Sequence, residues 1–169
     1  NAAGQVAADD QVITIVHAGT NSDLNLAPYD VALDANNNLY ALQHRQGLGD
    51  GALRLLSFPP YTNGAPALTN AQWAVGAGDN AMRGASGVAV DPTGTYVAAA
   101  FAGSLVSGSL SGGRTLVFNA TNGQTVLSII TDVGGGESHD HLDVAWDNVG
   151  NLYDVDNYEG LWRVFSPPG

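Results

Sequence analysis

The sequence predicts an all-β protein built from a repeated unit. Three segments, residues 29–40, 86–97 and 142–153, align with one another without gaps at offsets of 57 and 56 residues. Each segment contains an apolar strand, a turn that begins with Asp, and a second apolar strand. Asp bonds to its own backbone and Gly or Asn tolerates positive φ, so this pattern is typical of a hairpin. No stretch combines helical periodicity with helix caps.

Further strands follow each hairpin. Third strands are expected at 53–58, 114–118 and 161–165, and fourth strands at 72–75 and 125–130. Four antiparallel strands in a repeat of this length are the content of a β-propeller blade. The predicted fold is therefore a β-propeller segment, a single unit over residues 1–169. Its blades are expected at 28–78, 85–131 and 141–169, and the last blade lacks its fourth strand.

The start of the chain supplies a strand of the missing kind. After a flexible lead at 1–10, residues 11–17 contain an apolar run that matches a fourth strand. The strand order is then d-abcd-abcd-abc, where the letters give the position of each strand in its blade. Propellers typically need four or more blades to close, so a second copy, exchanging these strands, would complete a six-bladed ring. Half of a longer polypeptide and an open filament remain alternatives.

The last repeat carries a family resemblance. The segments HLDVAWDNVGNLYDVDN, at 141–157, and LWRVF, at 161–165, resemble NHL-type six-bladed propeller repeats. They look most like the propellers of secreted bacterial proteins that carry a C-terminal sorting signal. The resemblance covers residues 28–169 and implies the fold. It does not imply one activity, since that superfamily includes scaffolds, ligand-binding modules, lactonases and lyases.

Charge and composition limit the kinds of partner that the protein is expected to bind. Sixteen acidic residues against five basic ones give a formal net charge of -11. Nucleic acids and anionic membrane surfaces are disfavoured, because both need clustered Lys and Arg. There are no cysteines, so thiolate chemistry is excluded, and no apolar run is long enough to predict a membrane span. Low lysine and the acidic balance predict a secreted or cell-surface bacterial protein.

In a propeller, the connection in which a polar residue lies determines which face of the ring it occupies. The turns at Asp34, Asp91 and Asp147 belong to one face, and we expect these carboxylates to cap their own turns. The d-to-a and b-to-c connections share the opposite face. The candidate ligand residues expected there are His17, Asp30, His44, Arg45, Arg83, Glu137, Asp156 and Asn157.

A candidate metal site lies before and within the third blade. His139, His141 and Asp143 alternate, so in extended backbone they would share one side. Two histidines and a carboxylate suit Zn or Mn. Asp154 and Asp156 would share a face of the next strand and suit Ca. The alternative is a polar loop with solvated histidines and capping aspartates.

Three functions follow from these features. The first is a non-enzymatic propeller module for ligand binding or structural self-assembly, with itself as its main partner. The second is a metal-dependent hydrolase or lyase that uses the histidine-bearing face. The third is a lectin-like propeller in which Trp73, Trp146 and Trp162 stack on a glycan rather than packing between blades. The strand arginines, such as Arg163, are expected to face solvent.

Overall fold

The computed structural model confirms the all-β class. It describes residues 26–45, 55–60, 71–76, 85–101, 104–106, 109–111, 113–129, 141–156 and 160–167. Within these ranges every regular element is a strand, and no helix is long and apolar enough to cross a membrane. The lead at 1–10 and the expected strand at 11–17 lie outside the described residues.

The described strands form three antiparallel sheets of three or four strands and one separate two-stranded sheet. Each of the three larger sheets is a meander in its described strands. Sheet I comprises β1 (Leu26–Leu33), β2 (Leu39–Arg45), β3 (Leu55–Phe58) and β4 (Trp73–Val75). Sheet II comprises β5 (Ala85–Val90), β6 (Tyr96–Phe101), β9 (Arg114–Asn119) and β10 (Thr125–Ile129). Sheet III comprises β11 (His141–Trp146), β12 (Leu152–Asp156) and β13 (Leu161–Phe165). A small hairpin that the sequence did not predict, β7 (Ser104–Val106) and β8 (Ser109–Ser111), is inserted between β6 and β9.

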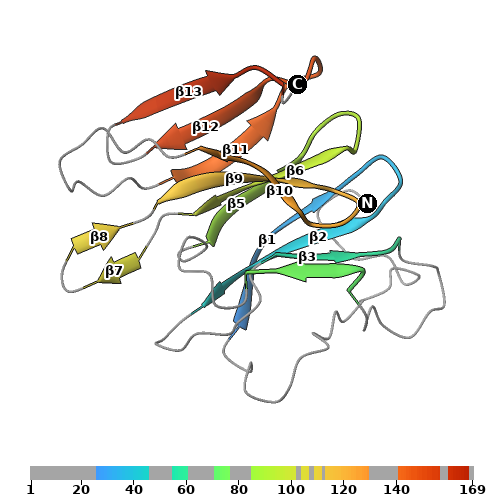
Figure 1. Ribbon diagram of the computed structural model, residues 1–169, viewed down its shortest axis with the longest axis horizontal. Helices are drawn as coiled ribbons and strands as arrows, with labels where there is room; N and C mark the ends of the chain where they lie inside the picture. The colour runs from blue at the N-terminus through green and yellow to red at the C-terminus, as the bar shows by residue number, and fades with distance from the viewer. Residues whose placement is uncertain are drawn as a thin grey trace, which may run out of the picture.

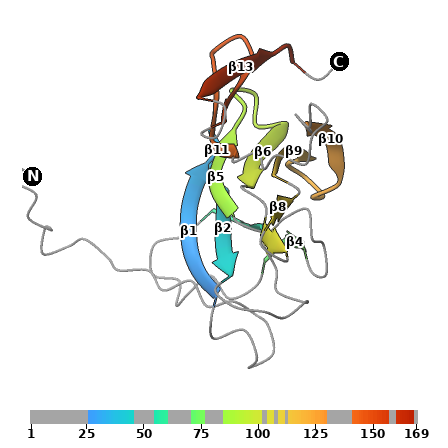
Figure 2. The same cartoon turned by 90° about the vertical axis from the view of Figure 1, so that its left-hand side faces the viewer.

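Sheet II lies between the other two sheets (Figure 1). One apolar cluster joins sheets I and II through side chains such as Tyr40, Leu55 and Phe118, and a second joins sheets II and III through Val117 and Leu152. The first strands of the sheets, β1, β5 and β11, lie next to one another (Figure 2). Position in this stack explains the burial of the strands. β6 and β9 in the middle sheet are buried on both faces and contain continuous apolar runs. In β12 of the outer sheet III, buried and more exposed residues alternate.

The Asp-led turns are held as predicted. Asp34 Oδ1 accepts the backbone N–H groups of Asn36 at 2.8 Å and Asn38 at 2.9 Å, and its Oδ2 accepts the Asn38 amide at 2.6 Å. The same carboxylate lies 3.5 Å from the Tyr40 hydroxyl. Burial raises the pKa of Asp34, but these hydrogen bonds outweigh it and hold the pKa below 3.8. Burial beside this carboxylate raises the pKa of Tyr40 to about 12.

Asp147 repeats the same arrangement with Val149, Asn151 and Tyr153. The side-chain amide of Asn151 is the main reason that the pKa of Asp147 lies below 3.8. Both turns need a left-handed residue, Asn37 with φ 63° and Gly150 with φ 88°, positions that Asn and Gly adopt at little cost.

The second turn corrects the gapless alignment. Asp91 Oδ1 accepts the N–H of Tyr96, five residues on, whereas Asp34 and Asp147 accept that of the residue four positions on. The turn in sheet II is therefore one residue longer. Tyr96 corresponds to Asn38, and Val97 to Leu39, so the side chains after the turn point to the opposite face from the one expected.

The depressed pKa of Asp34 predicts acid sensitivity. A carboxyl whose pKa is lower in the folded than in the unfolded state stabilises the fold above its unfolded value, near 3.8, and loses this contribution as the pH falls through the folded value. Asp34→Asn is therefore expected to lower the free energy of unfolding at pH 7, with a difference from the wild type that shrinks in acid. Urea unfolding at pH 7 and pH 3 measures this, and a difference of equal size at both would contradict it.

Candidate functional site

A fully buried polar cluster lies between sheets II and III. Thr115 on β9, His141 on β11 and Asp154 on β12 all have 0% exposure. The Thr115 hydroxyl donates to Asp154 Oδ1 at 2.6 Å, and His141 Nδ1 lies 2.8 Å from the same oxygen. The contact between His141 Nδ1 and Asp154 Oδ1 is a hydrogen bond in the ring tautomer that carries a proton on Nδ1. The buried hydrogen bond from Thr115 to Asp154 links sheet II to sheet III.

This cluster does not have the geometry of a nucleophilic triad. In such a triad the hydroxyl and the carboxylate bond to different nitrogens of the imidazole ring. Here the Thr115 hydroxyl and Asp154 both lie on the Nδ1 side, with the hydroxyl 3.2 Å from that nitrogen. The His141 side chain has 0% exposure, and its described contacts hold it beside Thr115 and Asp154.

Arg163 extends the cluster and corrects the expectation that it faces solvent. Its Nη1 lies 3.3 Å from Asp156 Oδ2 and 4.0 Å from Asp154 Oδ2, and its side chain is 22% exposed. Asp154 and Asp156 share the buried face of β12, as their spacing predicted. Asp154 Oδ2 has no hydrogen-bond donor within the described part of the chain. The Arg163 guanidinium lies 4.0 Å from that oxygen.

The predicted metal ligands are not brought onto one side within the described residues. A bulge interrupts β11 between His141 and Asp143, so His141 lies opposite the buried Asp156 and Asp143 opposite the exposed Val155. Among the described side chains no group of three His, Asp or Glu residues is arranged to hold a metal ion. His139 lies outside the described residues, so the Zn, Mn or Ca site stays a prediction.

The other predicted ligand residues are placed only in part. Asp30 lies on β1 and bonds to sheet II, and Asp156 is buried in the polar cluster. His44 and Arg45 are the last two residues of β2, without a described side chain. Outside the described residues lie His17, Arg83, Glu137 and Asn157.

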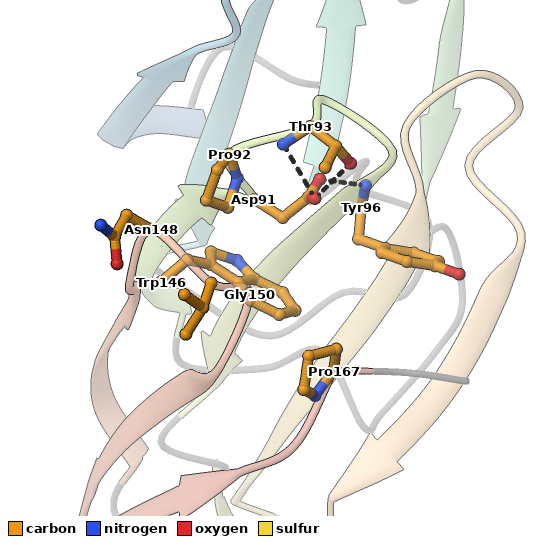
Figure 3. A pocket seen from close by; sticks show the side chains of 9 residues that line it. Asp91, Pro92, Thr93, Tyr96, Trp146, Asn148, Gly150 and Pro167 are labelled. Carbon is orange, nitrogen blue, oxygen red and sulfur yellow. Dashed lines mark hydrogen bonds between the residues drawn. The ribbon is translucent and has the colours of Figure 1, made fainter.

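A cavity of about 210 Å³ opens between the turns of sheets II and III (Figure 3). Trp146, Tyr96 and Pro167 form its apolar walls, and Asp91 lies at its rim. The Asp91 carboxylate already accepts the backbone N–H and the hydroxyl of Thr93. The cavity is on the side of the Asp-led turns, opposite the predicted ligand face.

The two outer faces of the stack differ in exposure from the faces between sheets. We call the face of a sheet that points to the next sheet in chain order its forward face, and the other its backward face. On the forward face of sheet I, Tyr40, Leu42 and Leu55 are at most 2% exposed, because sheet II covers them. The forward face of sheet II is covered by sheet III in the same way.

The forward face of sheet III is open. Strand pairing makes Tyr153, Val155 and Trp162 the counterparts of Tyr40, Leu42 and Leu55. Val155 is 41% and Trp162 68% exposed, and the Tyr153 and Trp162 rings stack at 6.3 Å. The counterparts of these side chains in sheet I are covered by sheet II.

The backward face of sheet I is open along its first strand. Val88 and Val144, at 7% and 5% exposure, are buried against the preceding sheet. Their counterpart in sheet I, Val31, is 56% exposed, and Leu33 on the same face is 60% exposed. The rest of this face is already buried in a separate cluster of Ala41, Leu56 and Phe58.

The tryptophans fall into two groups. Trp73 Nε1 donates to Ala120 O at 2.8 Å and Trp146 Nε1 to Ala89 O at 3.3 Å, so both join adjacent sheets as packing residues. Trp162 is the exposed one. The sequence did not distinguish it, because all three stand at strand positions. The sequence feature that could have identified Trp162 is its position next to Arg163. Neighbouring strand residues point to opposite faces, so a partly buried Arg163 implies an exposed Trp162.

Comparison with known proteins leaves the family open. No family model and no curated protein matches the sequence.

Proposed function

We propose that this protein is a non-enzymatic structural module that assembles with itself. Its three sheets are blades of a β-propeller, and a second copy completes a ring of six. The single observation that carries this proposal is the pair of open apolar faces. They are the forward face of the last sheet and the part of the backward face of the first sheet that lies along β1. The equivalent side chains of the other sheets are covered by a neighbouring sheet.

The two faces complement each other in a ring. Val155 of one copy would pack on Val31 and Leu33 of the other, as β2 of sheet I packs on β5 of sheet II. Trp162 would lie beside Val155 in the same junction. A twofold axis produces this junction twice, so neither apolar face remains open and the assembly closes. Aromatic residues at the centre of an interface contribute most of its stability, which gives Trp162 the leading role.

Charge supports a soluble, extracellular role for this assembly. A formal net charge of -11 opposes nonspecific aggregation. We assign the particle to the outside of the cell, as a secreted or surface-bound component. The acidic, histidine-bearing face of the ring is the surface we assign to a small ligand, a glycan or a divalent cation.

Light scattering on a size-exclusion column tests this function. The intact 17.3 kDa chain is expected to elute as a particle of twice that mass. A monomer at micromolar concentrations would contradict self-assembly. Large polydisperse particles would contradict ring closure and indicate an open filament.

A further inference from the structure

The outer edge of sheet III differs from the edges of the other two sheets. In sheets I and II the third strands, β3 and β9, each lie between two neighbours, because β4 and β10 pair with their outer sides. All four residues of β3 are buried. On the outer side of β13, the third strand of sheet III, no strand lies within the described part of the chain. Leu161, Trp162 and Val164 of β13 are at least 47% exposed, so sheet III ends on an open apolar strand.

At this edge, the backbone groups of two β13 residues point away from the sheet. Asp147 N–H donates to Asn151 O at 3.0 Å, so Asn151 directs its backbone groups towards β11. Successive residues of a strand direct these groups to opposite sides. The regular register from Asn151 through β12 to β13 therefore turns the backbone groups of Trp162 and Val164 away from β12. Groups of this kind can hold one further strand.

The third strand of sheet I shows what such groups do when a fourth strand is present. Ser57 of β3 takes the place of Val164 in the repeated register. Its backbone O accepts the N–H of Gln72, next to β4, at 2.7 Å, and its cross-strand partner on β4 is Trp73. The outward groups of β13 thus correspond to groups that hold β4 in sheet I.

Residues 12–16 supply a sequence that fits this edge. Their sequence, VITIV, consists of β-branched residues, which favour a strand. Residues 13–21 align without gaps with residues 72–80, the segment that contains β4, and both contain the pattern Val-x-Ala-Gly-x-Asn. The segment at 12–16 therefore resembles the fourth strand of sheet I.

The length of the connection that follows indicates which sheet this segment can reach. Ile129 of β10 precedes Val144 of β11 by 15 residues, and this connection leads from sheet II to the adjacent sheet III. Val16 also precedes Val31, the counterpart of Val144, by 15 residues. Sheet II separates sheet I from sheet III of the same chain (Figure 1). In the proposed ring, the sheet next to the backward face of sheet I is sheet III of the other copy.

We propose that residues 12–16 of the second copy add to the outer edge of β13 as the fourth strand of sheet III. The inference rests on the proposed function and deepens it, because it names a second contact at the same junction. In the register of β4, Thr14 of the second copy lies opposite Val164 and Val16 opposite Trp162. Each chain thus donates a strand to the other, and backbone hydrogen bonds reinforce the apolar contact.

A designed disulfide tests this register in a chain that contains no cysteine. In the variant Thr14→Cys/Val164→Cys, the two new side chains would lie opposite each other on one face of the extended sheet. Oxidation is expected to give covalent dimers in which mass spectrometry finds position 14 joined to position 164. Ile15→Cys/Val164→Cys is the matched control. It is expected to give roughly tenfold less covalent dimer, because its side chains point to opposite faces.

Amide hydrogen exchange in the unmodified dimer is a second readout that needs no substitution. The N–H groups of Trp162 and Val164 are expected to exchange slowly, because the added strand accepts their hydrogen bonds. Rapid exchange of both in a protein that light scattering shows to be dimeric would overturn the inference and leave the proposed function intact.

The form of the disulfide distinguishes the remaining outcomes. A disulfide within one chain would overturn the inference, because the strand would then belong to the same copy. Equal cross-linking of the two variants would also overturn it, since the register would then be wrong. A wild-type protein that is monomeric at micromolar concentrations and variants that do not cross-link would overturn the proposed function as well.

Discussion

Trp162→Asp is expected to convert the assembled particle into monomers without unfolding the chain. The side chain is 68% exposed in the single chain, so its replacement costs the fold little. In the proposed ring the same side chain would lie in the junction between the two copies. A buried charge there has no partner, and loss of such an aromatic anchor costs about 2 kcal/mol or more, roughly 30-fold in the dissociation constant.

Val126→Asp is the matched control for this variant. Val126 is 46% exposed on β10, a strand of the middle sheet that belongs to neither open face. The same charge there is expected to leave the particle mass unchanged. Equal loss of assembly in both variants would show a general effect of added charge and would contradict the role of Trp162.

Arg163→Met is expected to destabilise the fold strongly. The substitution keeps an apolar stem but leaves Asp154 and Asp156, both 0% exposed, without their described cation. Breaking a buried charge pair by removing one partner typically costs about 3–5 kcal/mol, because the remaining charge stays desolvated. Urea unfolding at pH 7 and a fixed protein concentration measures the loss.

A second substitution distinguishes charge from packing at Arg163. If the uncompensated carboxylate is the cause, Asp154→Asn in the Arg163→Met background removes part of the penalty. The two changes together are then expected to cost less than the sum of the single changes. Additive losses would mean that Arg163 stabilises the fold through the packing of its stem.

The sequence predicted the features that local chemistry determines. The Asp-led turns follow from Asp34 and Asp147 bonding to residues within six positions of themselves, and the strands follow from apolar runs between these turns. The extra residue in the Asp91 turn was missed, since Thr95 and Tyr96 align equally well with either register.

Features that depend on long-range packing were not predictable. The side chains that meet His141 and Arg163 are set by the stacking of sheet III on sheet II and by the bulge in β11, neither of which has a residue signature. The exposure of Trp162 is likewise a property of the stack. For this reason the sequence placed the candidate site in polar loops, whereas the structure places it on the open faces of the outer sheets.

A mixing experiment tests whether the two open faces pack against each other. Trp162→Asp damages only the forward face of sheet III, and Val31→Asp damages only the backward face of sheet I. Neither variant is expected to dimerise alone, because every junction would contain one damaged face. Mixed in equal amounts, they can form one junction from two undamaged faces, and light scattering is expected to detect mixed dimers. If the mixture stays as monomeric as its components, the two faces do not pack against each other and the ring is contradicted.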